Sequence, residues 1–581
     1  MWGPKGNREK KIFIDHESTN PQSVTESALR FMATKPANTS VWYGHNAGKF
    51  DSLFLLQGVH ALGWKAKCHI AGGRIIALEV KSPKAKFKIH DSYAIVQSKL
   101  KKAAKDFRLS SKKLLTKDDY SIDVRKWKIE RLIEGCFADC EVVLDLLDVA
   151  ETLFENHGGK LKTTFSSSAL TVVKSNSTLP FQDFSTSKKL IDLNSTARKS
   201  FNGGRVEVFT HTPQYLLKEW DINSSYPHSM SQSVPWEFVK ATSGKEAADW
   251  FDSTDFGGTV EATVSVPDTY LPVLPYRDED NDGIFFPIGQ WRGFFDADEL
   301  RYAIEQGTKL VSLHNFWIYT KEKPFGKFIS DFYELKSKSK GAMREFCKLV
   351  LNGCYGKFAQ KPENEEVIIM ESELEANALA FDDEYRHRIR YINASDSRFI
   401  ALTTIKWPKH THYALASAIT ALSRISLHKH LSKAKRLAYC DTDSIHASPQ
   451  TDLTSAESSL LGGLKVELDN YYGIFAAPKI YGLFPVKGKP HFASKGFPVD
   501  EKTWRRVVAG EVVETKRMQL AKRQMRRSNV VERPLTSRSW HGISAKRKPI
   551  DGPNGDTTPW TVQELRNKIH LQARSPVARK P

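Results

Sequence analysis

The sequence predicts an α/β protein of several domains. The chain has 581 residues, of which 40% are hydrophobic, and this is enough to fill more than one core. Segments with strand-like alternation, such as 436–448, are interspersed with segments of helical periodicity, such as 135–147. No uninterrupted apolar run reaches the length of a membrane span, so the sequence does not predict a transmembrane protein.

The charge balance indicates a polyanionic partner. Lys and Arg total 86 against 67 Asp and Glu, which gives a net charge of +19. Such an excess suits DNA, RNA or an anionic membrane surface and does not choose among them. The six cysteines form no CxxC pair and no zinc-binding spacing. They are therefore predicted to be buried thiols in a reducing compartment.

Two acidic centres stand out. Asp441 and Asp443 lie between two short alternating runs in RLAYCDTDSIHAS, which predicts a β-hairpin with an acidic tip. Asp221 follows a strand-like run at 215–220 and precedes a turn that ends in Tyr226. Acids that meet from distant parts of a chain favour a hard cation, Mg²⁺ or Mn²⁺, and can hold two ions for phosphoryl chemistry. An exposed acidic turn is the simpler alternative for the DxD pattern alone.

Three motifs follow one another in the order DxxSxYP (from Asp221), KxxxNxxYG (from Lys348) and YxDTDS (from Tyr439). This combination resembles family B DNA polymerases, and more narrowly the protein-primed branch of bacteriophages, adenoviruses and linear plasmids. The resemblance implies a right-hand polymerase of palm, fingers and thumb with two protein-priming insertions, preceded by an RNase H-like DEDD exonuclease domain. It also implies two Mg²⁺ or Mn²⁺ ions per active site, with Asp221 and Asp443 as direct ligands and Asp441 as a supporting acid.

The second motif lies in a predicted helix. Basic residues recur there every four positions, which predicts a stripe along one helix face: Lys336, Lys340, Arg344 and Lys348. By resemblance this is the fingers, where Arg344 and Lys348 would neutralise the triphosphate of an incoming dNTP and Asn352 would line its site. Tyr355 and Tyr226 would shape the pocket, with Tyr226 as the steric gate against a ribose 2′-OH. A solvated basic face is the alternative for the lysines alone.

The N-terminal part resembles the 3′→5′ exonuclease of this family. Asn46 and Asp51 lie where a predicted strand and turn lead into a helix, and Asp139 lies on a later predicted helix. These residues match the second and third exonuclease motifs, while Asp15 and Glu17 in KIFIDHEST match the first. The resemblance makes Asp15, Glu17, Asp51 and Asp139 metal ligands. A turn or a helix N-cap explains Asp15 and Glu17 equally well.

Two further features bear on the exonuclease. The third motif normally carries a Tyr four residues before its Asp, and this position is Gly135, which predicts weak or lost proofreading rather than a lost fold. The segment 90–107 resembles the family segment that binds single-stranded DNA, with Ser98 and Leu100 in the matching positions. An ordinary basic amphipathic helix is the alternative for this segment.

Other DNA contacts are implied by motif positions alone. The FNGGR segment resembles the YxGG motif at the junction of exonuclease and polymerase, with Phe in place of Tyr. A TxxxR pattern lies on a predicted helix at 414–430, and a KxY pair follows the acidic hairpin. The resemblance assigns DNA binding to Phe201, Gly203, Gly204, Arg205, Thr420, Arg424, Lys479 and Tyr481.

The matches also predict domain boundaries. Within the first insertion, 278–289 imitates an EF-hand, but its twelfth position is Gly289 rather than Glu, so a hairpin turn is expected instead of a calcium site.

The basic C-terminal region, including Arg547, is expected to follow duplex phosphates. The predicted units are an exonuclease-like domain 1–174, a linker 175–200, palm 201–234, first insertion 235–335, fingers 336–362, second insertion 363–405, palm 406–486, and thumb with basic tail 487–581.

The sequence therefore predicts a monomeric DNA-directed DNA polymerase that acts on template-primer DNA and dNTPs. A separate terminal protein would supply the first hydroxyl, and no membrane partner is expected. Two alternatives remain: a polymerase of the same fold that starts from an RNA or DNA primer, and a catalytically inactive DNA-binding relic of an integrated element. An organellar plasmid enzyme would work in mitochondria, and a viral one in the host cytoplasm or nucleus.

Overall fold

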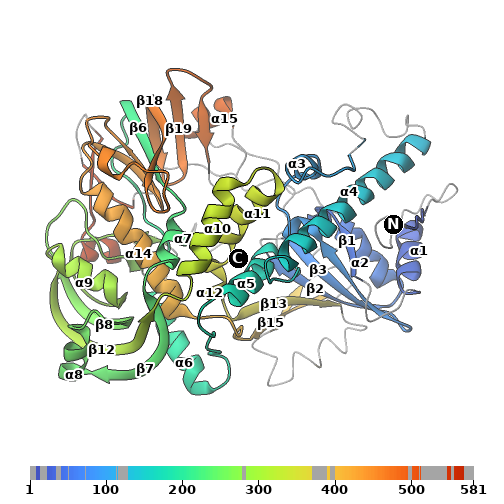
Figure 1. The fold of residues 1–581 in the computed structure, drawn as a ribbon, viewed down its shortest axis with the longest axis horizontal. Coiled ribbons are helices and arrows are strands. Elements are labelled where there is room, and N and C mark those ends of the chain that lie inside the picture. The colour runs from blue at the N-terminus through green and yellow to red at the C-terminus, as the bar shows by residue number, and fades with distance from the viewer. Residues whose placement is uncertain are drawn as a thin grey trace.

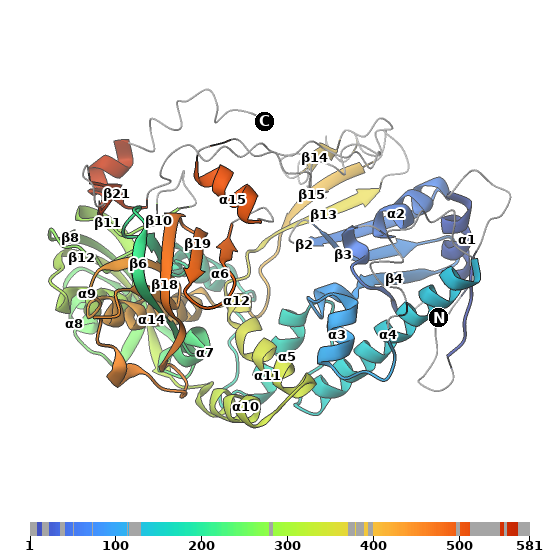
Figure 2. The same ribbon diagram turned by 90° about the horizontal axis from the view of Figure 1, so that it is seen from above.

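In the part of the chain that the structure describes, three β-sheets of four or more strands are connected by helices, and two further sheets have only two short strands each (Figure 1). In Figure 2 the N-terminal sheet lies to one side, and helices α5 (Phe165–Asn176), α10 (Gly326–Lys338) and α11 (Ala342–Gly353) lie between it and the other two large sheets. The structure is a computed structural model, and it describes residues 8–13, 22–34, 41–49, 51–71, 74–112, 114, 129–277, 283–369, 378, 389–392, 399–494, 500–509, 511, 546–550 and 555–567.

The N-terminal sheet has seven strands in the order β1-β4-β3-β2-β13-β15-β14. Only β1 and β4 run parallel to each other; the remaining neighbours are antiparallel. Three of its strands, β13, β14 and β15, come from the predicted second insertion. Strand β13 joins them to the N-terminal strands, because it pairs with β2 and places Val367 opposite Cys68. The bounds are β1 Val41–Gly44, β2 Lys65–Ala71, β3 Arg74–Lys81, β4 Lys86–Asp91, β13 Glu363–Ile369, β14 Ile389–Ile392 and β15 Phe399–Ile405.

Helices surround this sheet and close its core. Leu29, Val59 and Leu78 are fully buried in the cluster between the helices and the strands. The predicted strand, turn and helix around Asn46 and Asp51 are present as β1, a short 3₁₀ turn and α2, and the helix predicted to carry Asp139 is α4. The bounds are α1 Gln22–Met32, η1 Ala47–Lys49, α2 Asp51–Ala61, η2 Ser92–Ala94, α3 Leu100–Asp106 and α4 Ile129–Glu155.

The central sheet also has seven strands, in the order β20-β19-β18-β6-β17-β16-β5. The predicted acidic hairpin is its β16–β17 pair, in which Asp441 lies opposite Ser444. The bounds are β5 Val206–Val208, β6 Gln214–Ile222, β16 Leu437–Asp441, β17 Ser444–Ala447, β18 Leu464–Ala477, β19 Ile480–Pro485 and β20 His491–Ala493, with α7 Ser225–Met230 following β6, η6 Thr454–Ala456 following β17 and α15 Glu501–Val508 beyond β20.

A four-stranded antiparallel sheet in the order β11-β8-β12-β7 occupies the predicted first insertion. The short β9 strand, just before the EF-hand-like sequence 278–289, pairs with the short β10 strand inside it, which confirms the expected hairpin; residues 278–282 lie outside the described residues. The bounds are β7 Val234–Ser243, α8 Gly244–Phe251, β8 Phe256–Val266, β9 Tyr276–Arg277, β10 Ile284–Phe285, β11 Gly289–Asp296, α9 Ala297–Glu305 and β12 Lys309–Glu322.

Helix α14 (Tyr413–Leu431) lies at the meeting point of these units. Leu415 belongs to the cluster around α5, α10 and α11, Ile425 to the core of the four-stranded sheet, and Leu427 to the core of the central sheet. Helix α14 is therefore apolar on nearly all sides, as expected for a helix buried among several layers. The short α12 (Tyr355–Phe358) packs between α11 and α14.

The structure corrects three predictions at the level of the fold. The basic stripe is not on one helix, because α10 ends at Lys338 and Gly341, with φ of 62°, turns the chain into α11. The predicted linker 175–200 contains α6 (Lys188–Ala197) and η5 (Arg198–Ser200), and Asn194 of α6 donates to Thr411 O at 3.0 Å. Cys136 and Cys140 on α4 are exposed, so not all six thiols are buried.

The described residues near the C-terminus, 546–550 and 555–567, are named here the C-terminal strap and return to the body of the molecule. Its two short strands, β21 (Lys548–Pro549) and β22 (Thr557–Thr558), pair with each other. Among the described residues, no helix is both long and apolar enough to cross a membrane.

Candidate active site

Asp221, Asp441 and Asp443 meet at one end of the central sheet. Asp221 lies near the end of β6 and pairs with Ser444 of β17, while Asp441 is the last residue of β16. The backbone N–H of Ile222 donates to Asp443 O at 2.8 Å, which fixes the acidic turn against β6. The structure therefore brings Asp221 together with two acids, Asp441 and Asp443, that lie more than 200 positions later in the sequence.

The acidic turn has a specific backbone shape. Thr442 adopts a left-handed conformation with φ of 61°, its N–H donates to Arg205 O at 2.7 Å, and Asp443 N donates to Asp441 O at 2.6 Å. Gly204 lies against this turn, because a Cβ at Gly204 would come within 2.7 Å of the Thr442 side chain. Simple strand alternation from Asp441 to Asp443 does not describe the turn, since a left-handed residue separates them.

The three carboxylates differ in charge compensation. Lys479 Nζ lies 2.7 Å from both oxygens of Asp441, and the Tyr439 hydroxyl donates to the same carboxylate at 3.2 Å. Burial, with Asp221 and Asp441 nearby, raises the pKa of Asp443 to about 7. Burial, with Glu467 nearby, raises the pKa of Asp221 to about 6. Asp221 and Asp443 are thus the two acids that an added cation would stabilise most.

This donor set fits a magnesium site completed by substrate. Among the described residues, no three His, Cys, Asp or Glu side chains converge to hold a metal ion by themselves. Mg²⁺ is usually held by one or two carboxylates together with substrate phosphates and water. Asp221 and Asp443 provide these two carboxylates, and the charge of Asp441 is already compensated by Lys479.

Glu219 is a partly buried acid of this region that sequence reasoning missed. Burial, with Asp221 and Glu467 nearby, raises its pKa to about 7. Its carboxylate lies 3.7 Å from Nε2 of the buried His446, whose Nδ1 is 2.6 Å from the Tyr471 hydroxyl. A signal was present, because Glu219 precedes Asp221 by two positions on a strand and so shares its face.

The fingers residues approach the acids from the helical side. Tyr226 on α7 and Tyr355 on α12 stack with ring centroids 4.1 Å apart and planes at 23°. Lys336 of α10 lies near Arg344 and Lys348 of α11; burial and these two cations lower the pKa of Lys336. The helix break at Gly341 thus brings the basic residues together across a hairpin.

The exposed face of α11 continues this basic cluster. Arg344, Lys348 and Asn352 are exposed at spacings of four, so they share one side of the helix, as predicted. Lys336 Nζ donates to Ser224 Oγ at 3.2 Å, and Ser224 lies three residues after Asp221. Cations and aromatic rings therefore adjoin the acidic turn on one side.

Residues 32–120 and 111–445 match the family described as DNA polymerase type B, organellar and viral. The chain belongs to this family. It is 28% identical over 467 residues to the DNA-directed DNA polymerase of Enterobacteria phage PRD1, covering 78% of this chain and 75% of that one. A probable DNA polymerase of Ascobolus immersus is 25% identical over 556 residues, and this chain spans 44% of its length. The predicted family and its enzyme class, DNA-directed DNA polymerase, are confirmed.

Solved structures show the same type of fold. Phi29 DNA polymerase in complex with primer-template DNA and incoming nucleotide matches with a TM-score of 0.64 at 19% identity, covering 84% of this chain and 89% of that one. Phi29 DNA polymerase with single-stranded DNA matches with a TM-score of 0.63 and covers 92% of both chains. The predicted multidomain α/β fold of a polymerase is confirmed.

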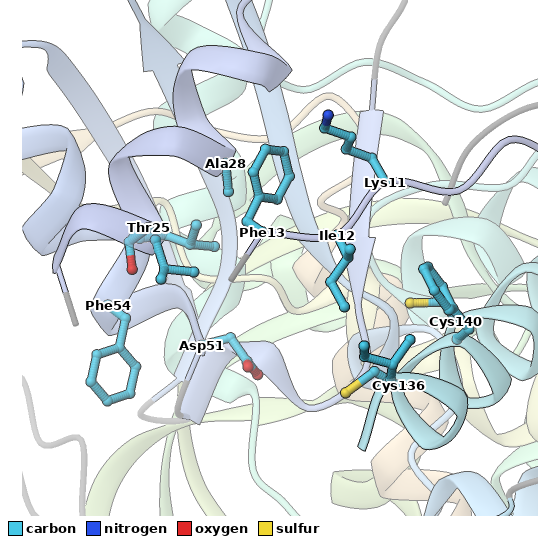
Figure 3. Close-up of a pocket in the computed structure, with 13 residues that line it drawn as sticks. Lys11, Ile12, Phe13, Thr25, Ala28, Asp51, Phe54, Cys136 and Cys140 are labelled. Atoms are coloured by element: carbon cyan, nitrogen blue, oxygen red, sulfur yellow. The ribbon is translucent and has the colours of Figure 1, made fainter. Parts of the chain in front are cut away.

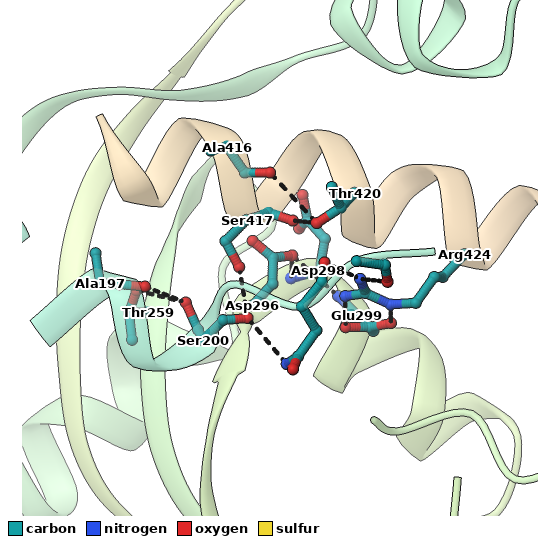
Figure 4. Close-up of polar contacts among 12 residues, drawn as sticks. Ala197, Ser200, Thr259, Asp296, Asp298, Glu299, Ala416, Ser417, Thr420 and Arg424 are labelled. Carbon is teal, nitrogen blue, oxygen red and sulfur yellow. Dashed lines mark hydrogen bonds and ion pairs between the residues drawn. The ribbon is translucent and has the colours of Figure 1, made fainter. Parts of the chain in front are cut away.

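Two residues expected to bind DNA in this type B polymerase are buried instead (Figure 4). Arg424 on α14 binds both carboxylate oxygens of Glu299 at 2.6 Å, and its third nitrogen donates to the carbonyls of Asn202 and Gly203 at 2.7 and 2.9 Å. Thr420 donates within its own helix. A phosphate cannot reach these groups, so the predicted direct DNA contact by Thr420 and Arg424 is wrong for this structure.

Arg205 is likewise unavailable to DNA. Its side chain is 1% exposed, and it donates to Glu207 at 2.6 Å and to Pro272 O at 2.7 Å. The structural function of Arg205 is to hold the strand that begins at Val206, and the predicted DNA contact is wrong for its side chain. A side chain at Gly204 would collide with Thr442, as described above, whereas a Cβ at Gly203 would make only an ordinary contact with Ile284, at 3.6 Å.

The remaining predicted DNA-binding residues lie at accessible or half-buried positions. Lys479 is a half-exposed turn residue with φ of 63° between β18 and β19, and Tyr481 follows it on β19. Phe201 is half-buried and lies edge-on to Tyr413, with ring centroids 5.8 Å apart. Ser98 and Leu100 lie at the start of α3, where Ser98 O is 2.9 Å from Nε2 of His45.

The N-terminal acids are only partly described. Asp15 and Glu17 lie outside the described residues. Asn46, with φ of 63°, accepts from Arg74 Nη2 at 2.5 Å, and burial, with Asp91 nearby, raises the pKa of Asp51. A pocket of about 500 Å³ opens beside Asp51, between α1, α2 and α4 (Figure 3).

The lining of this pocket is mostly apolar, with Asp51, Lys11, Thr25 and two thiols as its polar groups. Asp139 lies on α4 immediately before Cys140, one of those thiols. Gly135 is buried on the same helix, one turn before Asp139. The structure thus places Asp51 and the helix that carries Asp139 on two sides of one pocket.

Proposed function

We propose that this polymerase catalyses template-directed transfer of deoxynucleotides to a growing strand. The primer 3′-hydroxyl attacks the α-phosphate of a dNTP, a new phosphodiester bond forms, and pyrophosphate leaves. The observation that carries the proposal is the convergence of Asp221 and Asp443 beside the Tyr226–Tyr355 stack. Family membership agrees with this chemistry.

Asp221 and Asp443 are the proposed ligands of two Mg²⁺ or Mn²⁺ ions. When bound, these ions lower the pKa of the attacking hydroxyl and neutralise charge on the phosphates. Asp441 is a supporting acid and not a direct metal ligand in this proposal, because Lys479 holds its carboxylate in place and compensates its charge. The raised pKa values of Asp221 and Asp443 agree with this division, since burial outweighs the influence of the nearby lysines at both of these acids.

The fingers residues bind the incoming dNTP in this proposal. Lys348 and Arg344 are exposed cations on one face of α11 and would contact the triphosphate, with Asn352 beside them. Tyr355 stacks on Tyr226 at the side of the acidic turn, so together they limit the space for base and sugar. Tyr226 would exclude a ribose by contact with its 2′-oxygen.

The finer assignments follow the family. The central sheet would be the palm, the α10–α11 hairpin the fingers, the four-stranded sheet the first insertion, and the N-terminal sheet an RNase H-like exonuclease with Asp51 and Asp139 in its site. A hydroxyl of a separate terminal protein would start synthesis. Template-primer DNA and dNTPs are the proposed partners of a monomeric enzyme, with proofreading weakened by Gly135.

The decisive experiment is Mg²⁺-dependent primer extension with the full chain. Asp443→Asn keeps the shape of the side chain and removes its charge, so extension should be lost. Asp469→Asn makes the same change at an exposed position of β18 in the same sheet and should extend as the unsubstituted chain does. Equal extension by Asp443→Asn and Asp469→Asn would contradict the metal site.

Two further lanes separate the alternatives. Shortening of a primer without dNTPs, lost in Asp51→Asn, would demonstrate the exonuclease. Transfer of one dNMP to a protein hydroxyl without extension of a free primer would indicate strict protein priming. A folded, DNA-binding chain that does neither would be the inactive relic.

A further inference from the structure

The C-terminal strap is built into the polymerase core rather than extending from it. Two isolated bridges join it to distant parts of the chain, one from Asp556 to Thr210 and one from Thr561 to Ile288, and Figure 2 draws it in red at the end of the molecule that carries the four-stranded sheet. Ile288 N donates to Trp560 O at 3.0 Å, and Val562 N donates to Ile288 O at 3.1 Å. The strap therefore runs alongside the segment that directly precedes β11. On its other side, Thr557 N donates to Phe209 O at 3.0 Å.

One residue of the strap enters the interior. Arg547 is 1% exposed, and its Nε donates to Thr557 Oγ1 and its Nη2 to Tyr270 O, both at 3.0 Å. The guanidinium lies 4.8 Å from the ring centroid of Phe209, and Nη1 lies 3.8 Å from Glu207 Oε1. An arginine so placed cannot follow DNA phosphates, so the sequence-based expectation for Arg547 is wrong.

Glu207 is the buried acid whose negative charge Arg547 helps to compensate. It is fully buried on β5, and its other oxygen binds Arg205 at 2.6 Å. A buried carboxylate is costly unless it is paired, and removing one partner leaves an uncompensated charge. Glu207 therefore has one cation from its own strand and one from the strap, which is 340 positions away.

The same strand supports the catalytic turn. Val206 pairs with Asp441 and Glu207 with Cys440 across β5 and β16. Arg205 O accepts the hydrogen bond from Thr442 N at 2.7 Å, directly before Asp443. Any shift of β5 would therefore be passed to the acidic turn through backbone contacts.

We propose that Arg547 is a positioning residue, which acts through Glu207 and β5 to hold Asp443 in place for nucleotidyl transfer. The proposal rests on the proposed function of Asp443. It makes the C-terminal strap part of the active-site architecture, and it predicts a loss in the rate of transfer without a loss in DNA affinity. A basic tail that binds DNA by charge would show the opposite pattern.

Two neighbouring substitutions in the full chain test this proposal. Arg547→Met keeps an unbranched apolar stem in the interior and removes the charged guanidinium group. Lys548→Met makes the same change one residue later, where the ammonium group pairs with Glu564 at the surface at 2.6 Å. Pre-steady-state single-nucleotide incorporation gives the rate and the dNTP affinity, and primer-template binding across a salt series gives the affinity and its salt slope.

Arg547→Met should lower the rate constant of incorporation roughly ten- to hundredfold, because a displacement of a catalytic group by about 1 Å has an effect of this size. Its dNTP and primer-template affinities should stay unchanged. Arg547→Lys, which keeps the charge, should recover part of the rate. Lys548→Met should match the unsubstituted chain in every measurement.

Two results would overturn the proposal: an unchanged incorporation rate in Arg547→Met, or a loss confined to DNA affinity and salt slope. If Arg547→Met fails to fold, Arg547→Lys decides by the same measurements, since it keeps a cation beside Glu207 but loses the guanidinium hydrogen bonds to Thr557 and Tyr270. Failure of the proposed function would be seen separately, as absence of incorporation by the unsubstituted chain.

Discussion

Replacing Gly204 by alanine should slow catalysis, because Gly204 packs against the acidic turn. An added Cβ would lie 2.7 Å from both Cγ2 and Oγ1 of Thr442, whereas ordinary contact begins at 3.4 Å. The turn must therefore retreat by about 0.7 Å, the difference between 3.4 and 2.7 Å, and it carries Asp443 with it. A shift of this size in a catalytic group should lower the incorporation rate roughly ten- to hundredfold.

The neighbouring glycine supplies the control. A Cβ at Gly203 would meet only Ile284 Cδ1 at 3.6 Å, which is an ordinary contact, so Gly203→Ala should incorporate nucleotides as fast as the unsubstituted chain. Neither glycine has a positive φ, so alanine strains the backbone at neither position. Single-turnover incorporation measures both variants, and Thr442→Ser should restore part of the rate to Gly204→Ala. A larger defect in Gly203→Ala than in Gly204→Ala would refute the packing argument.

Three other substitutions test different parts of the structure. Lys348→Ala should raise the KM for dNTP roughly ten- to hundredfold, because hydrogen bonds to charged groups contribute about 1.5–3 kcal/mol; an unchanged KM in single-nucleotide incorporation would contradict the assignment. Glu299→Leu leaves Arg424 buried without its carboxylate and should destabilise the fold by about 3–5 kcal/mol, whereas adding Arg424→Met should recover most of this; equal unfolding transitions for the single and double variants would count against the pair. Burial and two nearby carboxylates raise the pKa of Asp296, so the folded chain keeps it protonated, and rising pH favours unfolding because only the unfolded chain loses the proton. Asp296→Asn keeps the N-cap of α9 and should raise the melting temperature, with a gap that widens between about pH 5 and pH 7; a gap independent of pH would contradict this.

The acidic turn was predictable because its signals are local. Two acids in a hairpin and a third acid at the end of a strand are visible as alternation and motif spacing, and the structure brings them together. Tyr226 and Tyr355 were likewise placed by motif. The break at Gly341 was harder to predict, since a single glycine inside a helical pattern is often tolerated.

The functions of the arginines were not predictable, for a physical reason. Sequence shows that Arg205, Arg424 and Arg547 are cations, but whether each one meets a phosphate or a buried carboxylate depends on partners far away in the chain. Glu299 lies 125 positions from Arg424, and no periodic pattern connects them. The net positive charge therefore overstates the surface available to DNA, because these three arginines are used inside the fold.

The pairing of β13 with β2 means that the N-terminal strands depend on a later part of the chain to complete their sheet. Without residues 363–369, the N–H and C=O groups of β2 that face β13 would form an open edge. Such an edge offers a template for pairing with a second chain, and Cys68 and its neighbours would be uncovered along it. A fragment that ends at residue 174 would therefore tend to self-associate, so the N-terminal domain is separable in the sequence but shares a sheet with a later part of the chain.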